Sequence, residues 1–316
     1  MRMVTKEAPL HSELSEAPND GRASWLQSGD GVHLRFATWS NISSTLGTVF
    51  IFPGRSDYIE MFGAAVSDFV EEGYAVAVVD WRGHGLSQRV AEDPYVGHVS
   101  CFLDYQTDVS AVVSSAKELG LPEPWYLIGH SMGAAIALRS LSSGMPVAAS
   151  VFTAPMWGIN LPWYERLVAK PASWFAKQLG KGEAYAPGVS RQSYVQRNPF
   201  EGNKLTTSLD NYNRWAAQGE LASELHTGGP SFGWLYAALG ETRKLSKIAS
   251  PSVPSIAFYG DEEAFVSVQA IHDRMARWPN GKLVPLANCR HEILLETREV
   301  RQEVVRQACG LFAEHR

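Results

Sequence analysis

"LIGHSMGAA", residues 127–135, joins an apolar run to small helix-forming residues through a serine that stands between two glycines. The pattern Gly-x-Ser-x-Gly, placed after a predicted strand and before a predicted helix, is typical of a nucleophile elbow. A serine on so sharp a turn adopts strained backbone angles, and glycine at positions 129 and 133 lets the strand and the helix approach closely. We therefore predict that Ser131 is a nucleophile.

A serine hydroxyl is a poor nucleophile unless a base takes its proton and an anion orients that base. We expect both partners downstream of Ser131, each in a loop after a strand. His291 fits the base, because it follows the apolar run "KLVPLA" and precedes a final helical segment. For the acid, "YGDEEAFV" offers Asp261, Glu262 and Glu263 directly after a predicted strand, and spacing does not choose among them.

Compact apolar runs recur along the chain, each bounded by Gly, Pro or Asp. They are "GTVFIFPG", "YAVAVVDW", "PWYLIGH", "AASVFTAP", "VPSIAFYG" and "GKLVPLA". Runs without alternation suit strands that are buried on both faces. Helix-length segments separate most of them, at residues 59–72, 102–119, 132–143 and 267–277, and a hairpin is predicted around residues 29–31. The alternation predicts an α/β fold with a mostly parallel central sheet flanked by helices.

One long interval interrupts this alternation. About ninety residues separate "FTAPMWG" from "SPSVPSIAFYG", far more than an ordinary strand-to-strand connection needs. Its tryptophans, tyrosines and Pro/Gly breaks indicate a mainly helical cap on top of the sheet. We therefore predict a core formed by residues 22–155 and 246–316, a cap at residues 156–245, and a loosely packed polar lead-in at residues 1–21.

The composition of the chain excludes several classes of protein. A formal net charge of -5 argues against nucleic acid as the main partner, because phosphate binding needs clustered basic residues. Three scattered cysteines are too few for a disulfide framework or a Cys-based zinc site. No apolar run reaches the roughly 18 residues of a membrane-spanning helix, and the N-terminus lacks a signal-like stretch, so we expect a cytoplasmic location. No metal site, phosphate loop or dinucleotide motif is evident, so we predict no cofactor.

Several stretches outside the serine motif carry further information. They are "PGRSDYIEMF", "DWRGHGLS", "GHVSCFLDYQTD", "FTAPMWGI", "GGPSFGW" and "HEILLE". Together with "GHSMGAAIA" they resemble the α/β-hydrolase superfamily, in the branch that contains monoacylglycerol lipases and a bacterial lysophospholipase. The resemblance extends from about residue 20 to residue 316. It implies an α/β-hydrolase fold with an inserted cap and serine-based ester hydrolysis without a cofactor.

The resemblance also bears on the acid. The acid loop of these families resembles Gly-x-x-acid-x-x-Val, and here Gly260 and Val266 frame Glu263 at the acid position. Asp is the commoner residue there, so this sequence departs from the pattern. Glu263 is the expected acid, and Asp261 is the alternative.

Family enzymes build the oxyanion hole, which binds the negatively charged oxygen of the reaction intermediate, from two backbone amides. The resemblance assigns these to Met132, directly after the nucleophile, and to Arg55 in the loop "PGR". That loop usually begins with His-Gly, and Pro53 replaces the histidine here. His84 and His130 lie in matching motifs and are expected to be structural.

The expected function is hydrolysis of esters of single-chain lipids, either lysophospholipids or monoacylglycerols. One alternative is a general carboxylesterase acting on small substrates. Another is a serine aminopeptidase, whose cap would need acidic side chains to bind the substrate's amine; the candidates are Glu183, Glu201, Asp210, Glu220 and Glu224. A remote alternative is a non-catalytic binding protein on a hydrolase fold.

The cap segment "LPWYERLVAKPASWFAKQLGK" mixes apolar side chains with four bases and a single acid. The bases are Arg166, Lys170, Lys177 and Lys181. One hypothesis is that this segment contacts an anionic membrane surface and admits single-chain lipids. Ordinary packing within the cap is the alternative. The sequence predicts no particular oligomeric state.

Overall fold

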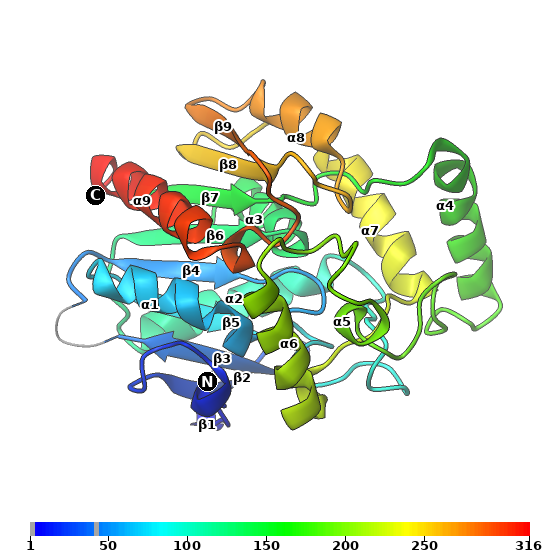
Figure 1. The fold of residues 1–316 in the computed structure, drawn as a ribbon, viewed down its shortest axis with the longest axis horizontal. Helices are drawn as coiled ribbons and strands as arrows, with labels where there is room; N and C mark the ends of the chain where they lie inside the picture. Colours follow the sequence, from blue (N-terminus) through cyan, green and yellow to red (C-terminus); the bar gives the residue numbers. More distant parts are fainter. Residues whose placement is uncertain (1–3, 41–43) are drawn as a thin grey trace.

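A computed structural model describes residues 4–40 and 44–316, apart from the side chains at positions 4, 5, 163 and 165–167. Within these residues, nine strands form one sheet in the order β1-β2-β3-β5-β4-β6-β7-β8-β9 (Figure 1). The strands are β1 (Val4–Glu7), β2 (Arg22–Gln27), β3 (His33–Trp39), β4 (Thr48–Phe52), β5 (Ala75–Val79), β6 (Trp125–His130), β7 (Ala149–Thr153), β8 (Ser255–Gly260) and β9 (Gly281–Leu286). Pairs from β1 to β3 and the pair β3–β5 are antiparallel, and the remaining pairs are parallel. The predicted β2–β3 hairpin and mostly parallel sheet are therefore confirmed.

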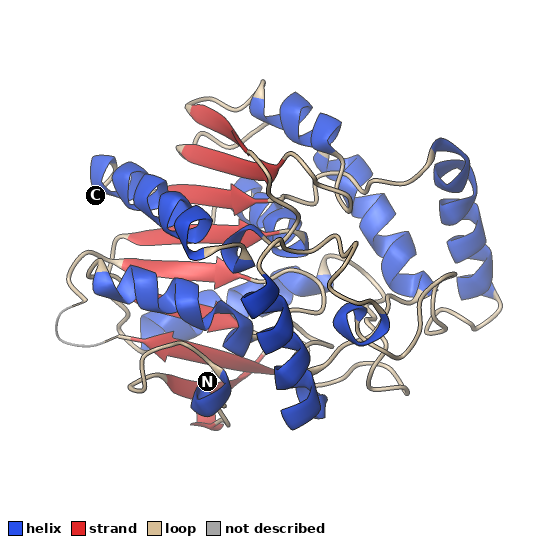
Figure 2. Cartoon of the chain, viewed as in Figure 1, coloured by secondary structure: helices blue, strands red, loops and turns tan. Residues whose placement is uncertain are grey.

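Helices cover both faces of the sheet, with α1 and α9 on one side and α2 and α3 on the other (Figure 2). The core helices are α1 (Gly63–Glu71), α2 (Asp104–Glu118), α3 (Met132–Ser142), α8 (Val268–Met275) and α9 (Arg298–Glu314), and single turns of 3-10 helix occur at Ser12–Leu14, Ile59–Phe62, Ser223–Leu225 and Ile293–Leu295. Every residue of β4, β5, β6 and β7 is buried, which explains why these strands are apolar throughout. Within the described residues, no helix has both the length and the apolar character needed to cross a membrane.

The register of the sheet brings four loops to one edge. Phe52 pairs with Gly129, His130 with Thr153, Thr153 with Phe258, and Gly260 with Leu286. The carboxyl ends of β4, β6, β8 and β9 are therefore aligned. In open α/β sheets, ligands bind at this edge, so the loops after these strands are the expected site.

Four helices lie within the interval predicted as the cap: α4 (Trp163–Gln178), α5 (Tyr194–Arg197), α6 (Leu209–Leu221) and α7 (Phe232–Leu245). They stand beyond the carboxyl ends of the strands, with α4 and α7 side by side (Figure 1). Hydrogen bonds tie this layer to the core: the Arg89 guanidinium donates to the backbone carbonyls of Glu224 and His226 at 2.7 and 3.0 Å. The layer thus covers the edge where the four loops meet.

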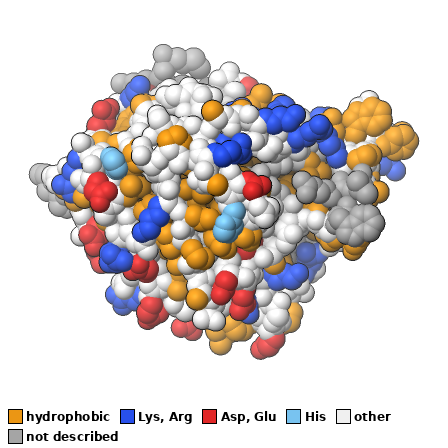
Figure 3. All heavy atoms as spheres, turned by 90° about the horizontal axis from the view of Figure 1, so that it is seen from above, with side chains coloured by type: hydrophobic (Ala, Val, Ile, Leu, Met, Phe, Trp, Pro, Cys, Tyr) orange, Lys and Arg blue, Asp and Glu red, His pale blue; other side chains and the backbone are white. Residues whose placement is uncertain are grey.

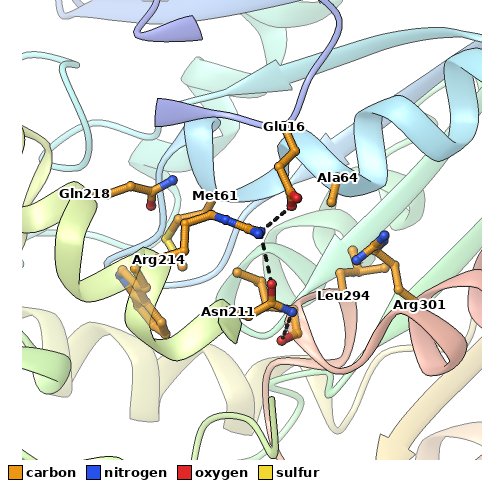
Figure 4. Close-up of a pocket in the computed structure, with 10 residues that line it drawn as sticks. Glu16, Met61, Ala64, Asn211, Arg214, Gln218, Leu294 and Arg301 are labelled. Atoms are coloured by element: carbon orange, nitrogen blue, oxygen red, sulfur yellow. Dashed lines mark hydrogen bonds and ion pairs between the residues drawn. The ribbon is translucent and has the colours of Figure 1, made fainter. Parts of the chain in front are cut away.

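The N-terminal lead-in is more ordered than we predicted. Its first described residues form β1, which pairs with β2 through backbone hydrogen bonds, and the mainly polar sequence "VTKE" gives no signal for such a strand. Further along, Gln218 of α6 donates to the Leu14 carbonyl at 2.7 Å, and Arg214 contacts Glu16 beside a small cavity of about 20 Å³ (Figure 4). The lead-in therefore links the edge of the sheet to the cap.

Candidate active site

Ser131 occupies the turn between β6 and α3 with a φ of 47° and a ψ of -115°. A positive φ is costly for a residue other than glycine and persists only where the surroundings enforce it. A Cβ atom at Gly129 would stand 2.8 Å from Cα of Ala134, and one at Gly133 would stand 2.0 Å from the carbonyl oxygen of Phe52. The strained serine and the close approach allowed by both glycines are therefore confirmed.

Three predicted side chains form one hydrogen-bonded chain. The Ser131 hydroxyl oxygen lies 2.9 Å from Nε2 of His291, and Nδ1 of His291 lies 2.7 Å from a carboxylate oxygen of Glu263. A His291 tautomer with its proton on Nδ1 donates to Glu263, which leaves Nε2 to accept the hydroxyl proton. Ser131 is 8% exposed and His291 is 5% exposed, so water screens these contacts little.

Both carboxylate oxygens of Glu263 are held, one by His291 and the other by the acid loop. The oxygen that does not face His291 accepts hydrogen bonds from the backbone amides of Phe265 and Val266 at 2.6 and 3.0 Å. Burial opposes ionisation, but the contact with His291 and these amides outweigh it and lower the pKa of Glu263. The carboxylate is therefore charged and fixed.

The two neighbouring acids have other partners. Asp261 accepts a hydrogen bond from the backbone amide of Cys289 at 3.3 Å. Glu262 accepts one from Arg290 at 3.1 Å. Of the three acids in this loop, the one that reaches His291 is Glu263, the residue favoured by the resemblance.

The loop after β4 lies directly against the serine. A Cβ atom at Gly54 would stand 3.1 Å from Cβ of Ser131, and the Gly54 amide donates to Asp57 at 2.6 Å. Among the described residues, the backbone amides of Arg55 and Met132 have no acceptor. Two donors without acceptors next to a buried serine fit the predicted oxyanion hole. Pro53, which replaces the usual histidine, leaves this loop intact, and its carbonyl accepts a hydrogen bond from the Trp81 ring at 2.9 Å.

A second group of charged residues lies beside these loops; of its members, only His130 was considered from the sequence, as a structural residue. Nε2 of His130 lies 3.0 Å from a carboxylate oxygen of Glu292 and 4.0 Å from one of Asp57. Burial opposes charge on the imidazole, but Glu292 and Asp57 outweigh it and raise the pKa of His130 to about 9. Burial and the Glu292 carboxylate raise the pKa of Asp57 to about 7. The one sign of this group in the sequence is that the stretches "PGRSDYIEMF" and "HEILLE" contain its two acids.

His84, the other histidine expected to be structural, is fully buried and its Nδ1 lies 3.0 Å from the Arg82 carbonyl. Burial lowers the pKa of His84 to about 3, so it is neutral at physiological pH.

One group of side chains in the described part of the chain has the spacing of a metal site. Ligand atoms of His130, His291 and Glu292 lie within 4.8 Å of one another. Both ring nitrogens of His291 already contact Ser131 and Glu263, so a cation would have to displace one of them. The ion pair between His130 and Glu292 accounts for the rest of the group.

Cap residues close over the site. Leu205 accepts a hydrogen bond from the Glu292 amide at 2.7 Å, and the Arg55 guanidinium donates to the Gly228 carbonyl at 3.0 Å. The ring of Phe265 lies 5.0 Å from the His291 ring and 5.8 Å from that of Tyr194, a cap residue. An aromatic side chain therefore lies beside His291, and the ring of a residue from the cap interval packs against it.

A strained serine after a central parallel strand, with its histidine after the last strand and a helical cap above, defines the chain as an α/β-hydrolase of the serine type. The chain belongs to the family described as serine aminopeptidase, S33, which matches residues 43–298. The fold and the superfamily predicted from the motifs are thereby confirmed.

Similar proteins include two bacterial lysophospholipases. The chain is 28% identical over 280 residues to lysophospholipase L2 of Escherichia coli (strain K12), which covers 84% of this chain and 80% of that protein. It is also 28% identical over 257 residues to the probable lysophospholipase L2 of Haemophilus influenzae, with 80% and 79% covered. The branch of the superfamily agrees with the prediction.

Solved structures share the fold. A soluble variant of monoglyceride lipase from Saccharomyces cerevisiae matches with a TM-score of 0.67 and 20% identity, covering 90% of this chain and 93% of that one. The monoacylglycerol lipase of Paleococcus ferrophilus matches with a TM-score of 0.68 and 16% identity, covering 89% and 98%.

Proposed function

We propose that this protein is a serine hydrolase that cleaves carboxylic esters of single-chain lipids. The observation that carries the proposal is the hydrogen-bonded chain Ser131–His291–Glu263 in a buried site. The two lysophospholipase relatives support a lipid substrate with one acyl chain. The chemistry is acyl transfer through a covalent intermediate.

In the first half of the reaction, His291 takes the hydroxyl proton of Ser131 as the serine oxygen bonds to the ester carbonyl carbon. The amides of Arg55 and Met132 donate to the resulting oxyanion. The carbon–oxygen bond to the alcohol then breaks, and His291 returns its proton to the leaving oxygen. In the second half, His291 deprotonates water, which attacks the acyl-enzyme; the fatty acid leaves and Ser131 regains its proton.

The roof over the site favours an acyl chain. The ring of Phe265 lies 5.0 Å from that of His291, the ring of Tyr194 lies 5.8 Å from that of Phe265, and the ring of Trp234 lies 5.7 Å from the Arg55 guanidinium. Because the serine and the histidine expose only 8% and 5% of their surface, we infer that cap side chains move aside as an ester binds. Burial of the acyl chain against these rings would provide the free energy for that movement.

An aminopeptidase activity is less well supported. An aminopeptidase would need acidic cap side chains to bind the amine of a peptide, and the five acidic cap residues named from the sequence are all exposed to solvent. A general carboxylesterase remains the second candidate, since the same residues cleave any ester that fits beneath the cap. A non-catalytic role is disfavoured because serine, histidine and acid are all present.

Turnover of four substrates by the purified protein tests the proposal: lysophosphatidylcholine, a monoacylglycerol, p-nitrophenyl acetate and an aminoacyl amide. We expect kcat/KM for one of the lipids to exceed that for the acetate by more than about tenfold, because each buried methylene contributes about 0.8 kcal/mol. Preference for the aminoacyl amide would refute the lipid assignment. The matched control is Ser131→Ala, which should lose all four activities together.

We also propose that α4 contacts an anionic membrane surface. In the described residues, Val168, Trp174, Phe175 and Leu179 expose between 49% and 60% of their surface along this helix and its end. Beside α4, a groove of about 480 Å³ is lined by Lys170 and Lys177 of α4 and by Arg243, Lys244 and Lys247 at the end of α7. Figure 3 shows basic side chains next to hydrophobic ones at the α4 end of the molecule. The side chains of Arg166 and its neighbours at 163, 165 and 167 lie outside the described residues.

Trp174 connects the two features, because it lies one helical turn from both Lys170 and Lys177. Tryptophan and lysine together suit the boundary between acyl chains and lipid head groups. Flotation with vesicles of phosphatidylcholine, with and without phosphatidylglycerol, tests the contact. We expect Lys170→Gln/Lys177→Gln to weaken binding to the anionic vesicles by about 25-fold, at about 1 kcal/mol per lysine. The double variant Lys117→Gln/Lys282→Gln makes the same charge change elsewhere, and equal loss in both would contradict the contact.

A further inference from the structure

Asp57, His130 and Glu292 connect the three loops that build the reaction centre. Each is attached to a different part of it: Asp57 is in the oxyanion loop, His130 directly precedes Ser131, and Glu292 directly follows His291. All three are buried, with exposed fractions of 1%, 1% and 4%. Residues far apart in the sequence are thus in contact at the point where the loops must be held in register.

Asp57 makes the contact that matters for the oxyanion hole. One of its carboxylate oxygens accepts the Gly54 amide at 2.6 Å, and the next amide along the chain is that of Arg55. The same oxygen lies 4.0 Å from Nε2 of His130. The direction of the Arg55 N–H therefore depends on a carboxylate that is held by the residue next to the nucleophile.

His130 is itself fixed from both sides of its ring. Its Nδ1 lies 3.0 Å from the Thr153 hydroxyl at the end of β7, and its Nε2 faces Glu292 at 3.0 Å. The rings of His130 and His291 are 5.2 Å apart. The charged or titratable groups facing this ring are Asp57, Glu292, Glu263 and His291, and the Arg55 guanidinium interacts electrostatically with Asp57.

A stabilising role does not explain why these charges are buried. Taking charged groups out of water is costly, and apolar side chains of similar size are often as stable or more stable. The benefit of such a cluster is its fixed geometry, because an ion pair has few arrangements once it is buried. A reaction centre needs its donors within a fraction of an ångström of the developing charge.

We propose that Asp57, His130 and Glu292 are positioning residues that hold the Arg55 amide of the oxyanion hole in register with Ser131 and His291. This inference deepens the proposed hydrolase function and rests on it. Asp57 holds the loop through the Gly54 amide, His130 faces Asp57, and Glu292 holds His130. None of the three touches the reacting atoms.

Asp57→Ala removes the acceptor for the Gly54 amide, whereas Asp57→Asn keeps an acceptor oxygen of the same shape. We expect the alanine variant to lose about 10–100-fold in kcat at nearly unchanged KM, less than the 100–1000-fold expected for removing an oxyanion donor outright. The asparagine variant should recover most of this loss. Rates are compared per folded molecule, after urea unfolding has given the folded fraction.

The control variant is Glu60→Gln. Glu60 belongs to another buried charged cluster, in which it contacts Arg35 at 2.7 Å. It should lower the free energy of unfolding and leave kcat per folded molecule unchanged. If Asp57→Ala does not fold, Glu292→Gln replaces it, since it removes the charge that holds His130 and should likewise lower kcat at unchanged KM.

A double-mutant cycle gives the sharpest test. Because Asp57 and His130 act on one loop as a unit, Asp57→Ala/His130→Ala should be no more than about threefold slower than the slower single variant. A double variant whose loss in kcat equals the product of the two single losses would overturn the proposal. So would a folded Asp57→Ala protein with the kcat of the wild type, or an Asp57→Asn protein as slow as the alanine variant. Failure of the hydrolase function itself is distinguishable, because the wild type would then show no ester turnover.

Discussion

Replacing Gly133 with alanine tests how closely the oxyanion loop lies against the nucleophile. A Cβ atom at this position would stand 2.0 Å from the carbonyl oxygen of Phe52 and 2.4 Å from that of Pro53. Since Cβ atoms essentially never approach other heavy atoms within 3.0 Å, the start of α3 and the end of β4 must separate by about 1 Å. A hydrogen bond of about 2.9 Å from the Arg55 amide to the oxyanion would then lengthen beyond about 3.5 Å and be lost.

Loss of one oxyanion donor lowers kcat by about 100–1000-fold, which corresponds to about 3–4 kcal/mol. We expect Gly133→Ala to show a fall of this size, with KM changed by less than about threefold, because the oxyanion forms only as the reaction proceeds. The assay is steady-state hydrolysis of a soluble ester. Crowding of a packed interior also costs about 1–3 kcal/mol of stability, so the folded fraction is measured first by urea unfolding.

Gly310→Ala is the matched control. Gly310 is exposed in α9, and a Cβ there meets nothing within 4 Å. Alanine at this site should raise the free energy of unfolding by about 0.5–1 kcal/mol and leave kcat unchanged. A folded Gly133→Ala protein whose kcat stays within about threefold of the wild type would refute the placement of the oxyanion loop.

Three further predictions concern the acid, a buried ion cluster and a buried histidine. Glu263→Gln should lower kcat by about 1000–10,000-fold without unfolding the protein, because an amide neither fixes the proton on Nδ1 of His291 nor stabilises the imidazolium. Near wild-type kinetics would exclude Glu263 as the acid. Arg35→Leu leaves the Glu60 and Asp80 carboxylates buried without the guanidinium that contacts both at 2.7 Å, and should lower the free energy of unfolding in urea by about 3–5 kcal/mol; a loss below about 1 kcal/mol would contradict the burial of this cluster. Burial lowers the pKa of His84 from its usual value near 6.5 to about 3. Below pH 6.5 the unfolded chain therefore binds a proton that the folded chain does not, so the free energy of unfolding falls as the pH falls from 6.5 towards 3. His84→Asn should reduce this slope by about 1.4 kcal/mol per pH unit, and equal slopes in urea titrations of both proteins would refute this prediction.

The parts of the site that follow from local sequence could be predicted. The turn at Ser131 needs glycine two positions before and two positions after the serine, so the motif alone predicts where the strand ends, which serine is the nucleophile and where the helix begins. His291 could be found because a single downstream histidine follows a predicted strand. The choice between Asp261 and Glu263 could not be made from spacing, because it depends on which carboxylate the folded chain brings to His291.

Contacts between distant segments were beyond the reach of the sequence. Asp57 and Glu292 appear as ordinary loop acids, and only the folded sheet brings them to His130. The strand β1 was missed for a related reason: its pairing with β2 depends on backbone hydrogen bonds, and its polar side chains give no period-two signal. Propensity and pattern report what a segment does alone, whereas these features depend on what the fold places beside it.

Labelling with a fluorophosphonate, followed by mass spectrometry of the peptides, tests the central claim most directly. The probe reacts only with a serine whose proton is removed by a neighbouring base. We predict a single labelled residue, Ser131, no label in Ser131→Ala, and labelling slowed by more than about 1000-fold in His291→Ala. A label on any other serine, or full ester turnover by Ser131→Ala, would contradict the account.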